Sequence, residues 1–167
     1  MRILAYLIVL AIATVVMMYV AGRRLPVAHV AARGERFDAP RDTVWRLITD
    51  VEGYAAWRKD LSSVELLPSV DGLPSWREIA GRDRVEYVAE EMVAPERFVV
   101  RIATKGLPYG GVWRYELFTD EGGTRVLITE EGEVYNPLFR FLMRYVVGET
   151  STIEKYLGQL GRRLAAT

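Results

Sequence analysis

The chain contains no cysteine and only one histidine, His29, among its 167 residues. The lack of cysteine excludes disulfides, thiolate nucleophiles and cysteine-ligated metals, and it leaves the redox compartment open. A single histidine cannot form a multi-histidine metal site. We therefore expect no metal site and no bound cofactor, and we interpret His29 as part of a linker at the edge of a membrane.

Net charge is also lacking, because 22 basic and 22 acidic residues balance at +0. A protein that binds nucleic acid usually carries an excess of basic residues, so the balance indicates no nucleic-acid partner. Half of the chain is hydrophobic and 26% is charged. These proportions are typical of a globular core, and the length suits one folded domain with a short extension.

No charged residue occurs in the stretch 3–21, ILAYLIVLAIATVVMMYVA. At about 1.5 Å per residue, a helix of this length spans about 28 Å, close to the roughly 30 Å hydrocarbon core of a bilayer. We expect a single-pass membrane anchor that occupies residues 1–24 together with its basic flank. A cleaved signal peptide is the alternative, since Arg2 precedes the run, but the run exceeds a usual signal core. Arg23 and Arg24 favour a cytoplasmic location for the domain that follows.

The remaining residues, 25–167, predict one α+β domain. Residues 27–40 alternate like a first strand, and residues 42–57 carry apolar side chains at helical spacing that Gly53 interrupts. We therefore expect two short helices after the first strand. Six strand-like runs separated by turn signals follow, beginning with a hairpin at Asp71–Gly72, and they predict an antiparallel sheet.

The last part of the chain predicts a long C-terminal helix, in which Gly148 marks a bend. Asn136 and Pro137 form a helix-start signal, with the asparagine as cap and the proline in the first turn. An apolar stripe then continues at three- and four-residue spacing. Its members are Leu138, Phe139, Leu142, Met143, Val146, Ile153, Tyr156, Leu157, Leu160 and Leu164.

Five segments carry a family resemblance: FDAPRDTVWRLITDVEGYAAW, RFVVRI, WRYELFTDEGGTRVLITEEGEV, NPLFRFLMRYVVG and IEKYLGQLGRRL. In this order they resemble the START-related, Bet v 1-like (SRPBCC) superfamily, and within it the polyketide cyclase/dehydrase-type group. The resemblance covers about residues 27–165. It implies a helix-grip fold, in which a curved antiparallel sheet of about seven strands wraps the long helix around a cavity for a hydrophobic or amphipathic ligand. It does not imply catalysis, because the superfamily includes carriers and receptors as well as cyclases.

Two-residue alternation assigns side chains to the inner face of the sheet and so to the candidate cavity wall. A slip of one residue would reverse each strand, so this assignment depends on the register. For Trp57, core or hinge packing is the favoured reading, and ligand contact is the alternative. The candidate ligand-cavity residues are Trp57, Tyr87, Phe98, Val100, Trp113, Tyr115, Val126, Ile128, Glu130, Arg140, Leu142 and Tyr156.

Glu130 is the carboxylate that this alternation turns inward, whereas Glu131 and Glu133 face water. Burial of an unpaired charge is costly, so Glu130 needs a partner or a raised pKa. We interpret Arg140 as that partner, in a structural clamp that Asn136 completes at the strand-to-helix corner. Two alternatives remain open: a polar anchor for a ligand head group, and a general acid or base.

Two functions fit this sequence. The first is a membrane-tethered module that binds or transfers a lipid, a quinone or another hydrophobic small molecule, because a ligand dissolved in the bilayer is concentrated beside the domain. The second is a polyketide cyclase/dehydratase-type enzyme that uses Glu130, Tyr115 or Arg140. We favour a non-catalytic binding protein. A protein-binding scaffold is a third reading, which a filled cavity and a large exposed apolar patch would support.

Overall fold

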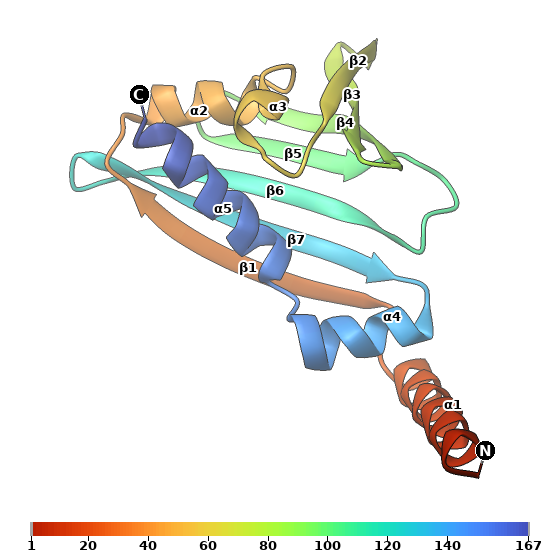
Figure 1. The fold of residues 1–167 in the computed structure, drawn as a ribbon. Helices are drawn as coiled ribbons and strands as arrows, with labels where there is room; N and C mark the ends of the chain where they lie inside the picture. Colours follow the sequence, from red (N-terminus) through yellow and green to blue (C-terminus); the bar gives the residue numbers. More distant parts are fainter. Residues whose placement is uncertain (1, 167) are drawn as a thin grey trace.

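A computed structural model of the protein describes residues 2–166, and Figure 1 shows its helices and strands. In chain order these are α1 Arg2–Arg23, β1 Ala28–Phe37, α2 Arg41–Thr49, α3 Tyr54–Trp57, β2 Ser63–Val70, β3 Leu73–Ala80, β4 Asp83–Val93, β5 Arg97–Ile102, β6 Tyr109–Asp120, β7 Gly123–Val134, α4 Pro137–Leu142, the π-helical turn η1 Met143–Val147, and α5 Ser151–Leu164.

The seven strands form one antiparallel sheet in the order β1-β7-β6-β5-β4-β3-β2. Strands β2 to β7 follow one another as a meander, and β1 returns to pair with β7 from Ala28↔Glu133 to Phe37↔Thr124. Helix α5 lies across one face of this sheet, and α2 and α3 lie near one end of α5 (Figure 1). The predicted α+β helix-grip architecture, with two short helices after the first strand, is therefore confirmed.

The predicted register of the central strands is also confirmed. Five of the six side chains assigned to the inner face are buried, and the sixth, Trp113, packs partly buried against the same cluster. The buried five are Phe98, Val100, Tyr115, Val126 and Ile128. Alternation works here because one face of the sheet is covered by helices while the other faces water.

Helix α5 supplies the opposite wall of the core. Ile153, Tyr156, Leu157 and Leu160 recur at three- and four-residue spacing, and all four are at most 5% exposed. The Tyr156 ring touches the sheet directly, with its centroid 5.5 Å from that of Tyr115. The stripe predicted for this half of the C-terminal segment therefore faces the sheet.

The first half of that segment departs from the prediction of one long helix. Helix α4 passes into the π-helical turn η1, and the helix is broken at Gly148, where φ is +94°. Val146, expected on the apolar stripe, is 66% exposed. A π-helical turn changes the residue count per turn, so it rotates the following side chains off the spacing of an α-helix. The stripe therefore does not continue onto η1.

Helix α1 lies apart from the core and meets the domain only near its own C-terminal end (Figure 1). A side chain at Gly22 would place its Cβ 1.9 Å from the carbonyl oxygen of Pro137, so only glycine permits this approach of α1 to α4. The large apolar side chains before it are exposed. In length and composition α1 is the one helix among the described residues that suffices to cross a membrane, a property that signal sequences share.

The matched phenylalanines Phe98 and Phe118 test the register. Phe98 is 0% exposed and Phe118 is 48% exposed. We expect Phe98→Ala to lower the free energy of unfolding by about 3–5 kcal/mol, because it leaves a cavity in the core. Phe118→Ala should cost less than ~1 kcal/mol, since the ring already contacts water. Urea denaturation in detergent solution measures both. Equal losses from the two variants would show that the register is wrong.

Candidate functional site

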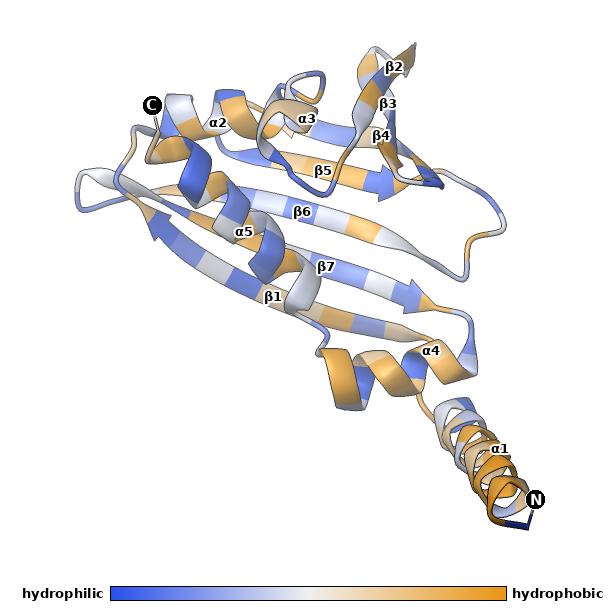
Figure 2. Cartoon of the chain, in the orientation of Figure 1, coloured by the Kyte–Doolittle hydropathy of each residue, from blue (hydrophilic) through white to orange (hydrophobic). Residues whose placement is uncertain are grey.

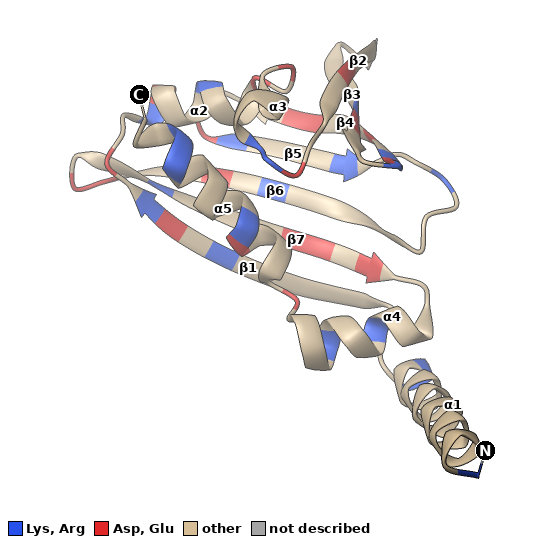
Figure 3. Ribbon diagram, in the orientation of Figure 1, with Lys and Arg blue, Asp and Glu red and all other residues tan. Residues whose placement is uncertain are grey.

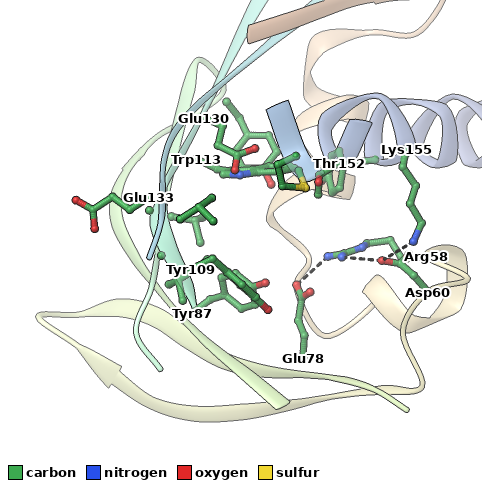
Figure 4. A pocket seen from close by; sticks show the side chains of 18 of the residues that line it. Arg58, Asp60, Glu78, Tyr87, Tyr109, Trp113, Glu130, Glu133, Thr152 and Lys155 are labelled. Atoms are coloured by element: carbon green, nitrogen blue, oxygen red, sulfur yellow. Dashed lines mark hydrogen bonds and ion pairs between the residues drawn. The ribbon is translucent and has the colours of Figure 1, made fainter. Parts of the chain in front are cut away.

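A cavity of about 340 Å³ lies between the inner face of the sheet and the helices, and Figure 4 shows most of the side chains that line it. Aromatic and aliphatic groups form most of its wall. The lining residues are His29, Tyr54, Arg58, Asp60, Trp76, Glu78, Tyr87, Val100, Ile102, Tyr109, Gly110, Gly111, Trp113, Tyr115, Glu130, Glu133, Val134, Phe139, Met143, Thr152, Lys155, Tyr156 and Gln159.

An ion pair between Arg58 and Glu78 forms the first polar group of the cavity wall. Arg58 follows α3, and its Nη1 donates to Glu78 Oε1 on β3 over 2.8 Å. Its Nη2 lies 3.2 Å from Asp60 Oδ2, and Trp76 Nε1 donates to the same Glu78 oxygen over 3.2 Å. Burial alone would lower the pKa of Arg58, but Glu78 and the other nearby groups hold that pKa above its ordinary value. The guanidinium is therefore a permanent cation at the cavity surface.

Tyrosine rings surround this cation. The guanidinium carbon of Arg58 lies 5.3 Å from the Tyr54 ring centroid and 5.6 Å from that of Tyr156. These are cation–π distances, which add to the ion pair in fixing the arginine. Burial raises the pKa of Tyr54, Tyr115 and Tyr156, so all three hydroxyls stay protonated. Within residues 2–166 the buried Tyr156 hydroxyl makes no hydrogen bond of normal geometry, although the Tyr54 and Tyr115 side chains lie near enough to act on its pKa.

Glu130 and His29 form a second polar group, on the adjacent strands β7 and β1. His29 Nε2 lies 3.8 Å from Glu130 Oε1. The imidazole lies over Gly132, where an added Cβ would come within 2.3 Å of the ring, so the absence of a side chain makes room for it. In the β6–β7 pair Trp113 faces Glu130 and Gly111 faces Gly132. Figure 4 shows Glu130 and Arg58 on different sides of the cavity, so its wall carries two separate polar groups.

The Glu130 carboxyl group is poised between its two protonation states. Burial raises its pKa to about 7, while a hydrogen bond from the Trp113 side chain opposes the shift. Glu130 Oε2 is buried and has no hydrogen-bond partner within residues 2–166. An unsatisfied buried carboxyl oxygen that borders a cavity can donate or accept a hydrogen bond from a bound molecule.

The structure brings six of the twelve candidate residues to the cavity wall: Tyr87, Val100, Trp113, Tyr115, Glu130 and Tyr156. Phe98, Val126 and Ile128 lie deeper, in the fully buried core. Trp57 packs behind the wall, with its ring centroid 5.5 Å from that of Tyr156. Leu142 lies on α4 and does not line the cavity. That any of these side chains contacts a ligand stays a prediction.

The predicted clamp between Glu130 and Arg140 is wrong. Glu130 faces His29, and Arg140 Nη1 instead donates to the carbonyl oxygen of Leu25 over 3.1 Å. Arg140 borders a different hollow, between α4, η1 and the residues that follow α1. Asn136 does cap α4 as predicted, because its side chain accepts from the backbone N–H of Phe139. The helix start is thus satisfied locally, and Glu130 is left to the cavity.

The sequence analysis missed His29, Arg58 and Glu78, which belong to the two polar groups of the cavity wall. His29 was interpreted as linker, but β1 begins at Ala28 and places the imidazole in the cavity. Arg58 and Glu78 belong to segments that the sequence analysis treated only as a helix end and a hairpin strand. Trp76 and Glu78, two residues apart on β3, share the inner face, so parity could have identified the inward carboxylate.

Glu78 and Glu65 provide a matched pair of carboxylates for a stability test. The Glu78 side chain is 8% exposed beside Arg58, whereas the Glu65 side chain is 50% exposed beside Arg77. We expect Glu78→Gln to lower the free energy of unfolding by about 3 kcal/mol, because it leaves a buried guanidinium short of its partner. Glu65→Gln should change it by less than ~1 kcal/mol. Urea denaturation measures both, and a cost at Glu78 no larger than at Glu65 would contradict a buried pair.

The raised pKa of Glu130 predicts a pH-dependent stability. Between the ordinary value of 4.5 and the folded value of about 7, the folded protein binds more protons than the unfolded chain. Stability should therefore fall as the pH rises from about 5 to about 8, by up to ~3 kcal/mol from this group. Glu130→Gln should remove that part of the fall, whereas Glu131→Gln should preserve it, because the Glu131 side chain is 54% exposed and lies outside the cavity wall. Identical pH profiles for wild type and Glu130→Gln would contradict the shift.

Comparisons with solved structures find the same fold in several proteins. A START superfamily protein from Mycobacterium smegmatis shares 14% identity over 83% of this chain and 98% of its own, with a TM-score of 0.68. The Zhui aromatase/cyclase from Streptomyces sp. R1128 shares 17% identity over 83% of this chain and 94% of its own, with a TM-score of 0.67. A protein from Thermus thermophilus shares 23% identity over 83% of this chain and 98% of its own, with a TM-score of 0.65.

A search of curated proteins finds no significant match to this sequence. A family model described as "Polyketide cyclase / dehydrase and lipid transport" matches residues 29–165, a range that includes every residue lining the cavity. The match agrees with the resemblance that the sequence segments carry and with the helix-grip fold. The chain belongs to the polyketide cyclase / dehydrase and lipid transport family.

Proposed function

We propose that this protein is a membrane-tethered module that binds, or transfers, a hydrophobic or amphipathic small molecule in the cavity between its sheet and α5. The observation that carries the proposal is the cavity itself, which stays open inside an otherwise packed core. Its volume of about 340 Å³ lies within the range of small-molecule sites. Among residues 2–166 no group of three or more histidine, aspartate or glutamate side chains is arranged to hold a metal ion.

The chemistry of the wall indicates the class of ligand. Rings such as Trp76, Tyr87 and Trp113 offer apolar surface, and the polar groups at Arg58 and Glu130 stand on different sides. A molecule with an apolar body and at least one oxygen-bearing end matches this arrangement. Arg58 and the Tyr156 hydroxyl favour an acceptor such as a carbonyl or carboxylate, and Glu130 favours a hydroxyl.

The position of the cavity supports a ligand that comes from the bilayer. His29, Val134 and Met143 line both the cavity and the hollow beside the end of α1. One side of the cavity therefore lies next to the helix that is proposed to span the membrane, with the domain on its cytoplasmic side. A ligand dissolved in the bilayer would be held at a high effective concentration beside this wall.

The names of the relatives agree with such ligands. The family description names lipid transport, and one solved structure of the same fold is an aromatase/cyclase. A lipid, a quinone or a polyketide-like molecule would each present an apolar body and a polar end. A protein-binding scaffold is disfavoured, because the cavity is not filled by side chains of the chain itself.

A polyketide cyclase/dehydratase-type enzyme is the second candidate, and the state of Glu130 favours it. A carboxyl group with a pKa of about 7 inside a cavity is suited to general acid and base catalysis near neutral pH. Tyr115 is a weaker candidate, since burial raises its pKa and keeps it neutral. Arg140, the third residue considered for this role, does not border the cavity.

Native mass spectrometry of the detergent-extracted protein tests the proposed function. We expect the wild type to carry a hydrophobic molecule of defined mass. Ile102→Trp should lose it, because the larger side chain fills the cavity that Ile102 lines. Val93→Trp is the matched control, since Val93 is 41% exposed and lies outside the cavity wall.

Two outcomes of that measurement contradict binding in the cavity: no co-purified molecule in the wild type, or equal retention by both tryptophan variants. Glu130→Gln separates a carrier from an enzyme. A carrier should hold the same molecule in wild type and variant. A dehydratase that depends on Glu130 should instead accumulate, in the variant, a species heavier by one water.

A further inference from the structure

Helix α4 is fixed against the end of the apolar helix α1. Gly22 is buried against the backbone of Pro137, the first residue of α4. With α1 across a bilayer, this contact holds α4 and η1 at the level where the hydrocarbon core meets the lipid head groups. Figure 2 shows hydrophobic residues along both α1 and α4, whereas the strands farther from α1 are more mixed.

The turn η1 exposes three consecutive large apolar side chains. Tyr145 is 63% exposed, Val146 is 66% exposed and Val147 is 54% exposed. Such a run on the water-facing surface of a domain needs a partner, since contiguous exposed apolar patches mark interaction sites. Tyrosine in particular is enriched where the apolar bilayer core meets water. Because the run continues from α4, which packs on α1, the bilayer is the partner nearest to it.

A hollow of about 370 Å³ beside this run carries an arginine without a carboxylate partner. It lies between residues 25–30, α4 and η1. Arg140 Nη1 donates to Leu25 O, its Nε is buried without a hydrogen-bond partner, and within residues 2–166 it forms no ion pair. The other arginine in the hollow, Arg144, is bound by Glu149 over 3.0 Å. The unmatched positive charge of the hollow is therefore that of Arg140.

We infer that α4, η1 and residues 25–30 form a membrane-contact surface: Tyr145, Val146 and Val147 lie among the lipids, and Arg140 binds a lipid phosphate in the hollow. An arginine with a free N–H suits this role, because its fork of donors matches phosphate oxygens. Exposed apolar residues next to arginines are also typical of segments that lie in the membrane interface. The inference rests on the membrane tether of the proposed function, and the experiment below separates the two.

Single-cysteine spin labels test the contact surface, and the absence of cysteine from the chain makes each label unique. Labels are placed at Val9 in α1, at Val146, and at Phe118, which is exposed at the far end of β6. The full chain is reconstituted in nanodiscs of phosphatidylcholine and phosphatidylglycerol. Accessibility of each label to oxygen, which concentrates in lipid, is compared with accessibility to a water-soluble nickel complex.

We expect the Val9 and Val146 labels to favour oxygen and the Phe118 label to favour the nickel complex. If the Val146 label behaves like that at Phe118 while the Val9 label lies in lipid, the contact surface is wrong and the tether stands. If the Val9 label also favours the nickel complex, the tether itself is wrong.

The phosphate site is tested by the lipid that stays bound on release from the nanodisc, measured by native mass spectrometry. Arg140→Gln should lose retained phosphatidylglycerol, whereas Arg125→Gln, the same change at an exposed position at the start of β7, should retain it. Arg140→Lys keeps the positive charge and a hydrogen-bond donor, so it should retain an intermediate amount of phosphatidylglycerol. This variant shows whether lipid loss in Arg140→Gln comes from the lost charge or from misfolding.

Excess inorganic phosphate distinguishes the two sources of the anion. A lipid site should keep its phosphatidylglycerol in the presence of phosphate, because the acyl chains hold it in place. Displacement of the lipid by phosphate would assign Arg140 to a free anion and overturn the lipid site. Equal retention by the Arg140→Gln and Arg125→Gln variants would also overturn it.

Discussion

The ion pair between Arg58 and Glu78 is the contact on which the cavity depends. A charged arginine inside a domain is stable only when a carboxylate and further donors and acceptors surround it. Here Glu78 holds one arm of the guanidinium, Asp60 holds the other, and the rings of Tyr54 and Tyr156 border its faces. Because the guanidinium has an acidic partner on each arm, this wall of the cavity is polar and its charge is compensated. The cavity lies beside this ion pair.

Two glycines in the sheet leave room on the other side of the cavity, because they have no side chains. Gly111 and Gly132 face each other across β6 and β7, and the His29 ring occupies part of the room they leave. Glu130 has a histidine beside it, but within residues 2–166 its second oxygen has no hydrogen-bond partner. If the inner face of β7 served stability alone, an apolar residue would be expected at the position of Glu130. An inward carboxyl group of this kind is a common mark of a functional site.

Much of the fold followed from the sequence, because local signals and the global arrangement agree. The alternation in β5, β6 and β7 identified the buried face that includes Phe98 and Ile128, and the spacing in α5 identified the stripe around Tyr156.

The candidate site was harder to predict from the sequence, because its interacting pairs join segments that are distant in the chain. Arg58 meets Glu78 across 20 residues and His29 on β1 meets Glu130 on β7, near the opposite end of the domain sequence. The predicted pairing of Glu130 with Arg140 assumed that two opposite charges close in sequence at a corner must form an ion pair. In the structure, His29 on β1 lies beside Glu130 instead. Figure 3 shows basic positions in the segment that α4 begins, which lies beside α1, and acidic positions along β7.

With α1 across a bilayer, as proposed above, the close approach of Gly22 to Pro137 would also limit how far the domain can move. A domain on a flexible linker sweeps a hemisphere above the membrane, and its reach grows with the length of the linker. Here α1 is wedged against α4 with no room for a side chain between them, so the domain and the helix turn as one body. If α1 spans a bilayer as proposed, such a body has a fixed height above the membrane and a fixed orientation. An acceptor for a molecule carried in the cavity would then have to come to the surface of the same membrane, or bring a second membrane within the height of a single small domain.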